Sequence, residues 1–355
     1  MIVDEKHYRS VWLEGGTVYM VNQSLLPHRF EIFESPDHQR TTRAISNFVV
    51  RGAGAVGTAA GFALAQAVIE APEKEFDSYI QTAADELLKT GISPHTLTIC
   101  VERVLKKVKK APTPADAKQT AVAEAQALAD ADVKACQKIG ELGNALLSDG
   151  CRVLTHGSGG WLSSTDWGTS LSPVYVAKRS GKNVFVWVGE ERPGLQGARL
   201  TAWELGKEKI PLALIADAAT GHIMQRGEVD AAIVGCEWIA RNGDVLARIG
   251  TFEKAVLAKA CRVPFYVCAS LKALDPACAS GKDLPLEERA AEEMVKIQGR
   301  DDVGALHAVT AYPEGIDVKN PQFDVTPAKY VTGYITEKGV LTAEKLKGLF
   351  RESPA

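Results

Sequence analysis

Five short apolar runs, each followed by a helical pattern, dominate the second half of the chain. They lie between residues 151 and 270 and read CRVLTH, NVFVWVG, PLALIAD, DAAIVG and PFYVCAS. Strands that alternate with helices in this way are typical of a parallel, doubly wound sheet. We therefore predict a Rossmann-like α/β fold here. Polar loops should gather in one crevice beyond the carboxyl ends of the strands.

The first half of the chain has mainly helical spacing. The segment VWLEGGTVYMV, residues 11–21, predicts a small β-hairpin that turns at Gly15 and Gly16. Helical patterns cover residues 35–47, 75–89, 97–110 and 116–147. We predict a mainly helical N-terminal domain over residues 1–125 and a Rossmann-like C-terminal domain over residues 126–355. The segment KAPTPAD, residues 110–116, or the long helix after it, should connect them.

The amino-acid composition limits the kinds of molecule that this protein is expected to bind. The chain has 355 residues, with 41 basic and 44 acidic side chains and a formal net charge of -3. This balance gives no electrostatic basis for binding nucleic acid or an acidic membrane surface, so we expect a small-molecule ligand. The seven cysteines form no CxxC pair, which favours reduced thiols in the cytoplasm. We expect no membrane-spanning stretch, no metal and no cofactor.

Two segments are candidates for a ligand site. In RGAGAVGTAAGFALA, residues 51–65, closely spaced glycines could expose backbone N–H groups to an anion beneath Arg51, or could only let helices pack closely. The spacing differs from the dinucleotide fingerprint. In the second segment, Cys236 and Glu237 directly follow the buried run DAAIVG. A thiol and a carboxylate at a strand end suit chemistry, although a structural cysteine beside a solvated acid is the alternative.

These segments carry a resemblance that extends over nearly the whole chain. The chain resembles the sugar-phosphate isomerases that include methylthioribose 1-phosphate isomerase and ribose 1,5-bisphosphate isomerase, related to regulatory subunits of translation initiation factor 2B. The matching segments are VVRGAGAVGTAAGFALA, GEERPGLQGARLTAWEL, VDAAIVGCEWIARNGDVLARIGTFEKAVLAK, LPLEER and NPQFDVTPAKYVTGYITEKGV. The resemblance implies a helical domain followed by a Rossmann-like domain, in a homodimer.

The chain departs from the family pattern at the implied active site. The family's isomerases carry a cysteine in a THC motif and an aspartate in a GAD motif, whereas this chain has Gly157 and Glu237 there. The family's Asn-Lys pair is Ala247-Arg248, and its phosphate-binding Arg-Pro-Thr is replaced by Gly91-Ile92-Ser93. Loss of a general acid or base typically slows a reaction about 10²- to 10⁴-fold. Cys236, His156 or Ser158 could replace the missing thiol, or the reaction could be absent.

We therefore expect a diverged aldose–ketose isomerase, an intramolecular oxidoreductase that shifts a proton or hydride between C1 and C2 of a small sugar or sugar phosphate. The alternative is a non-catalytic protein that binds a sugar phosphate or regulates a partner. The expected catalytic residues are Glu237, Cys236 and His156, and the expected substrate-binding residues are Arg51, Gly52, Ala53, Gln196, Arg248 and Ser158. His156 could instead be a structural histidine at a strand end.

Overall fold

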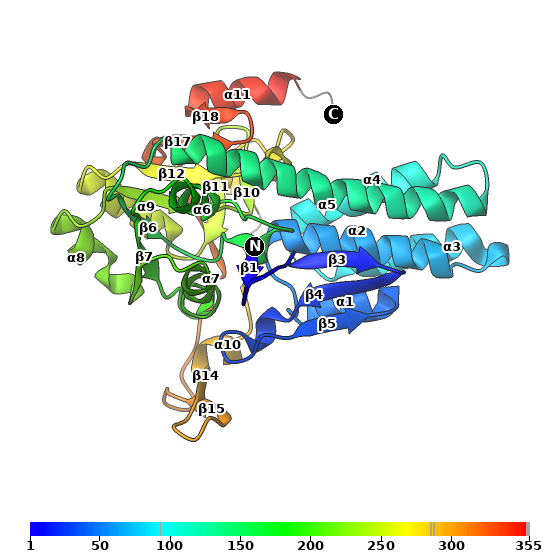
Figure 1. Ribbon diagram of the computed structural model, residues 1–355, viewed down its shortest axis with the longest axis horizontal. Helices are drawn as coiled ribbons and strands as arrows, with labels where there is room; N and C mark the ends of the chain where they lie inside the picture. Colours follow the sequence, from blue (N-terminus) through cyan, green and yellow to red (C-terminus); the bar gives the residue numbers. More distant parts are fainter. Residues whose placement is uncertain (93, 285, 287, 353–355) are drawn as a thin grey trace.

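The computed structural model describes residues 1–92, 94–284, 286 and 288–352 (Figure 1). A helical region and a sheet region lie side by side, each with its own hydrophobic core. Helix α5 (Pro114–Asn144) runs along both of them, because Leu128 packs in the first core and Ile139 in the second. The predicted domain boundary between residues 125 and 126 falls inside this helix.

The N-terminal region is a helical layer with one small sheet. Its helices are α1 (His38–Ser46), α2 (Ala53–Glu70), α3 (Phe76–Lys89) and α4 (Pro94–Val108). Its strands are β1 (Ile2–Val3), β2 (Lys6–His7), β3 (Val11–Glu14), β4 (Thr17–Val21) and β5 (Ile32–Ser35). The predicted hairpin is confirmed as β3 and β4, and β5 adds a third antiparallel strand that the sequence did not predict.

Helix α2 is the centre of the N-terminal core. It contacts α1, α3, α4 and α5, and its small residues permit this because Gly57 faces Cys100 and Gly61 faces Leu128. Within the described part of the chain, α2 is also the one helix long and apolar enough to cross a membrane, so our expectation that no such stretch exists was wrong. Since 78% of that stretch is buried inside the protein, its composition is that of a core helix.

The C-terminal region is built on a seven-stranded sheet in the order β18-β17-β12-β9-β6-β7-β8. All neighbours are parallel except β17 and β18. The strands are β6 (Arg152–Thr155), β7 (Phe185–Gly189), β8 (Leu212–Ile215), β9 (Ala231–Val234), β12 (Phe265–Cys268), β17 (Gly333–Thr336) and β18 (Gly339–Leu341). The helices are α6 (Ser172–Arg179), α7 (Ala202–Lys207), α8 (Thr220–Gln225), α9 (Thr251–Ala260) and α11 (Ala343–Glu352). The predicted doubly wound sheet is confirmed.

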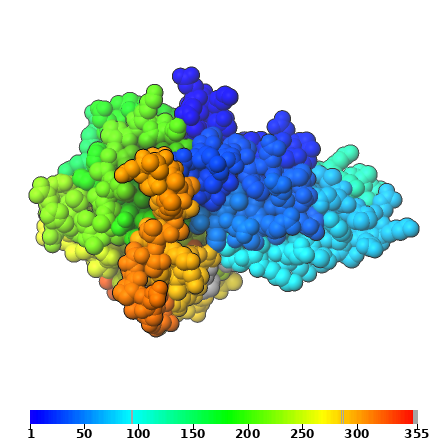
Figure 2. Space-filling model, turned by 90° about the horizontal axis from the view of Figure 1, so that it is seen from below, coloured from blue at the N-terminus to red at the C-terminus, as the bar shows by residue number. Residues whose placement is uncertain are grey.

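A second sheet and a projecting hairpin complete this region. The second sheet has the order β13-β10-β11-β16, formed by β10 (Trp238–Ala240), β11 (Val245–Arg248), β13 (Leu274–Asp275) and β16 (Phe323–Thr326). Helix α10 (Glu292–Val295) leads into the ribbon of β14 (Lys296–Arg300) and β15 (Leu306–Thr310). This ribbon stands out from the body of the molecule (Figures 1 and 2).

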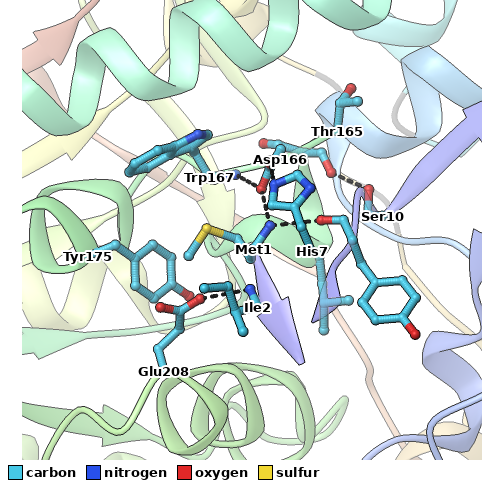
Figure 3. A network of polar contacts seen from close by, with 12 residues as sticks. Met1, Ile2, His7, Ser10, Thr165, Asp166, Trp167, Tyr175 and Glu208 are labelled. Atoms are coloured by element: carbon cyan, nitrogen blue, oxygen red, sulfur yellow. Dashed lines mark hydrogen bonds and ion pairs between the residues drawn. The ribbon is translucent and has the colours of Figure 1, made fainter. Parts of the chain in front are cut away.

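The first residues of the chain are held against the C-terminal region by a polar network (Figure 3). The buried Met1 ammonium group lies 2.7 Å from Asp166 Oδ1 and donates to the Tyr8 carbonyl oxygen. His7 Nε2 lies 3.0 Å from Asp166 Oδ2. Burial lowers the pKa of this ammonium group, while the charge of Asp166 opposes the shift. The network thus joins the N-terminal strands to the loop that follows β6.

Candidate active site

The candidate site lies where the strand order of the main sheet reverses. β7 and β8 follow β6 on one side, while β9, β12 and β17 extend the sheet on the other. Ligands of open α/β sheets bind beyond the carboxyl ends of the strands at such a switch point. Here the loops after β6 and β9 meet the N-terminus of α2 and form a cleft between the two regions. Fold topology therefore explains why residues far apart in the sequence converge.

The cleft has two adjoining lobes. The inner lobe is lined by residues that include Asp132 and Lys272, and the basic lobe by residues that include Arg51 and Gln196. Both are lined by Gly52, Ser158, Glu237 and Arg248, which therefore lie where the lobes meet. All nine predicted site residues line one or both lobes: Arg51, Gly52, Ala53, His156, Ser158, Gln196, Cys236, Glu237 and Arg248.

The N-terminus of α2 and a cluster of guanidinium groups give the basic lobe its charge. Gly52 precedes the helix with a φ of 88°, and a side chain there would collide with Ser163. Burial, then the charges of Arg248 and Arg199, lower the pKa of Arg51 to about 10. Several positive guanidinium groups therefore lie near the N-terminus of an 18-residue helix, whose free N–H groups and dipole also attract negative charge. Together they form a favourable site for an anion.

Glu237 and Cys236 differ in their surroundings, although they are adjacent. Glu237 is half-buried, lines both lobes, and its backbone N–H donates to the Leu246 carbonyl oxygen at 2.9 Å. The Cys236 sulfur lies 3.9 Å from the Cys268 carbonyl oxygen and packs against the core of the C-terminal region. Burial, together with the charge of Glu237, raises the pKa of the Cys236 thiol. Of the two groups, the carboxylate is the better placed to exchange a proton with a ligand.

The Arg248 side chain covers the position at which the family carries its cysteine. Gly157 has a φ of 78°, and a Cβ atom added there would lie 3.1 Å from Arg248 Cγ. Arg248 Nε lies 3.2 Å from Glu191 Oε1, and Glu191 is only 2% exposed. The guanidinium group also lies over the Phe323 ring. The aliphatic part of the Arg248 side chain therefore lies beside the position at which the family pattern has a thiol.

A network of polar contacts holds the loops behind Arg248. His156 Nε2 lies 2.7 Å from the Ile249 carbonyl oxygen, and its Nδ1 lies 3.4 Å from Asp217 Oδ1. Asp217 accepts hydrogen bonds from the backbone N–H groups of Glu191 and Arg192. Burial raises the pKa of Asp217, but bonding to His156 and Arg192 and the charge of Lys254 outweigh it and lower that pKa. His156 thus contacts the site as part of its supporting network.

Two charged residues of the inner lobe were not predicted. Asp132 of α5 is 2% exposed and accepts the Thr165 backbone N–H at 2.8 Å. Lys272 follows β12, and its Nζ lies 3.6 Å from Asp132 Oδ1. Burial lowers the pKa of Lys272, but the charge of Asp132 outweighs it and raises that pKa. The position of Lys272 after a sheet strand is the sequence signal that could have identified it.

The tryptophans around the loops have structural contacts. Trp161 is fully buried, Trp167 lies under Arg179, and Trp238 stacks on His95 with ring centroids 4.5 Å apart. Of the Gly91-Ile92-Ser93 segment, Ile92 lines the basic lobe, and Ser93 lies outside the described residues. Over the described ranges, no group of three or more His, Cys, Asp or Glu side chains is arranged to hold a metal ion.

Comparisons with known proteins agree with this architecture. A family model described as the initiation factor 2 subunit family matches residues 49–343. Methylthioribose-1-phosphate isomerase from Methylorubrum populi is 40% identical, with 99% of each chain aligned, and the enzyme of that name from Geotalea daltonii is 39% identical, with 95% of this chain and 96% of the relative aligned.

Two solved structures have a similar fold, one of them described as an isomerase and the other as a subunit of a translation initiation factor. The crystal structure of 5-methylthioribose 1-phosphate isomerase from Pyrococcus horikoshii has a TM-score of 0.87 at 38% identity, covering 98% of this chain and 97% of the other. That of translation initiation factor eIF-2B, subunit delta, from A. fulgidus has a TM-score of 0.83 at 35% identity, covering 96% and 100%. The chain therefore belongs to the initiation factor 2 subunit family.

Proposed function

We propose that this protein interconverts the aldose and ketose forms of a small sugar phosphate. The observation that carries the proposal is Glu237, a carboxylate at the junction of the two lobes, beside a cluster of cations at the start of α2. The names of the full-length relatives and of one similar structure support this reaction class. Arg51, Gln196 and the α2 N-terminus would hold the phosphate.

The chemistry requires one proton carrier and one group that stabilises negative charge. In our proposal for a sugar 1-phosphate, the Glu237 carboxylate removes the C2 proton as the bond between C1 and the ring oxygen breaks, and the ring oxygen takes a proton from water. Glu237 then returns its proton to C1, while the C2 hydroxyl group loses its proton to water and becomes the ketone. Arg248 stabilises the negative charge that develops on the C2 oxygen during these steps. The raised pKa of the Cys236 thiol and the contacts of His156 with Ile249 and Asp217 make both less suited to moving this proton.

One experiment tests both the reaction and the role of Glu237. The protein is incubated in D₂O with methylthioribose 1-phosphate, ribose 1,5-bisphosphate and shorter sugar phosphates, and product and deuterium incorporation are followed by NMR. We expect a ketose product that carries deuterium, and a rate about 10²- to 10⁴-fold lower for Glu237→Gln. Glu253→Gln, which changes an exposed glutamate of α9, is the matched control and should retain the wild-type rate.

A binding protein without activity is the second candidate. It is favoured by Gly157, which offers no acid or base and is covered by Arg248. Calorimetric binding of these sugar phosphates with neither turnover nor deuterium exchange would support this candidate and overturn the isomerase. If Glu237→Gln left a measured turnover unchanged, the reaction class would stand and our assignment of the base would be wrong.

We also propose that the protein works as a homodimer in the cytoplasm. All seven cysteines are free thiols, which suits a reducing compartment. Light scattering coupled to size-exclusion chromatography tests the dimer, since a monomer mass at micromolar concentration would contradict it. Fractionation of cells that express the protein tests the location.

A further inference from the structure

The inner lobe differs from the basic lobe in the kind of charge it carries. Asp132 comes from the helical region and Lys272 from the sheet region, and their side chains meet at 3.6 Å in the lining of the lobe. The small polar residues Thr96, Ser163 and Ser164 line the same lobe. The opposite charges of Asp132 and Lys272 largely cancel. This end of the cleft therefore offers a strong hydrogen-bond acceptor and a strong hydrogen-bond donor with little net charge.

The apolar side chains that line this lobe are all short. Among the described residues that line it, the apolar side chains are Ala53, Cys236, Ala269 and Ala273. An apolar group placed here would displace water from Asp132 and Lys272 without replacing its hydrogen bonds, which is unfavourable. A second phosphate would lie against the Asp132 carboxylate. A hydroxyl group can donate to Asp132 and accept from Lys272, so it matches both partners.

We infer that the substrate is a sugar phosphate whose end remote from the phosphate carries free hydroxyl groups, in place of a methylthio group or a second phosphate. This inference rests on the proposed function for the placement of the phosphate in the basic lobe. The reacting carbons would then lie beside Glu237 and Arg248, where the lobes meet, and the remote end would enter the inner lobe. Asp132 and Lys272 become the residues that determine specificity.

Binding of four related compounds tests this inference by calorimetry. The compounds are ribose 1-phosphate, 5-deoxyribose 1-phosphate, methylthioribose 1-phosphate and ribose 1,5-bisphosphate. We expect ribose 1-phosphate to bind at least about 10-fold more tightly than the other three, because a site built to bind a hydroxyl group discriminates against analogues that lack it. In Lys272→Met, which keeps the length of the side chain, this preference should fall to about 3-fold or less.

Controls separate specificity from folding. Lys272→Gln, which keeps a donor, should retain part of the preference, and Lys134→Met, on the exposed side of α5, should retain all of it. Tighter or equal binding of methylthioribose 1-phosphate by the wild type would overturn the inference, as would an unchanged preference in folded Lys272→Met.

Failure of the proposed function gives a different result from failure of this inference. A preference for ribose 1-phosphate without any turnover would contradict the isomerase alone, since binding is measured independently of the reaction. Turnover with methylthioribose 1-phosphate preferred would contradict the inference alone. If none of the four compounds binds, both are wrong.

Discussion

The Glu204→Gln substitution should make the stability of the protein less dependent on pH. Glu204 lies in α7, is fully buried, and its Oε2 accepts from the Leu162 backbone N–H at 3.2 Å and from the Tyr175 hydroxyl at 3.3 Å. Burial raises its pKa from 4.5 to about 8. Because the folded protein holds this proton more tightly than the unfolded chain, the stability contributed by Glu204 falls as pH rises from 4.5 to 8.

The size of the effect follows from that shift. At about 1.4 kcal/mol per pKa unit, the change from 4.5 to about 8 corresponds to at most about 5 kcal/mol, and relaxation around a buried charge reduces it to roughly 2–3 kcal/mol. Glutamine is neutral at every pH and has nearly the same shape. The variant should therefore match the wild type near pH 5 and exceed it above pH 8.

Thermal unfolding between pH 5 and pH 9 measures this difference. In a domain of 150–250 residues, each kcal/mol shifts Tm by about 2–4 °C, so the variant should unfold several degrees higher than the wild type at pH 8.5. Glu253→Gln, at an exposed position of α9, is the matched control and should follow the wild type throughout. A Tm difference between Glu204→Gln and the wild type that stays constant with pH would refute the reasoning.

Two further substitutions test the polar networks. Asp166→Asn leaves the buried Met1 ammonium group without its carboxylate and should lower the unfolding free energy by about 3–5 kcal/mol, measured by urea denaturation; a loss below about 1 kcal/mol would contradict the contact. Asp217→Asn should cost about 2 kcal/mol at pH 7, because the lowered pKa of Asp217 means that its contribution is present above about pH 4 and lost as pH falls below that value. Equal destabilisation at pH 3 and pH 7 would argue against this assignment.

Local sequence patterns were sufficient to predict much of the fold. The run DAAIVG predicted a fully buried strand, and β9 is buried at all four positions because helices cover both faces of a parallel sheet. The second sheet was missed, although Asn242 and Gly243 between β10 and β11 form a recognisable hairpin turn. β17 was missed because nothing in the short segment GYIT shows that it pairs with β12.

Some residues of the candidate site could likewise be predicted from local sequence patterns, and others could not. Residues in loops after β6 and β9 could be predicted to converge, because the carboxyl ends of parallel strands share one edge. Asp132 could not, since it lies in the middle of α5 and faces the cleft only through the packing of the helical region on the sheet region. Its partner Lys272 is 140 positions away in the sequence. Contacts between domains leave no periodic signal in either segment.

Gly157 and Arg248, which both differ from the family pattern, lie next to each other in the structure. A side chain at 157 would adopt a left-handed backbone conformation, and its Cβ atom would lie 3.1 Å from Arg248 Cγ, so Arg248 would have to shift slightly. Glu191 then fixes the guanidinium group, and Asp217 fixes the loop that carries Glu191.

The Arg248 guanidinium group is one of the charges that lower the pKa of Arg51. Arg51, Arg199 and Arg248 place three guanidinium groups near one another, with the Glu191 carboxylate bound to one of them. In our proposal, the substrate phosphate binds beside these cations and relieves their mutual repulsion. The family's lysine at position 248 is also a cation, so Gly157 removes an acid while Arg248 keeps a cation that can stabilise an oxyanion. Among the described residues, Glu237 is the carboxylate that lines both lobes, and our proposal therefore assigns proton transfer to it.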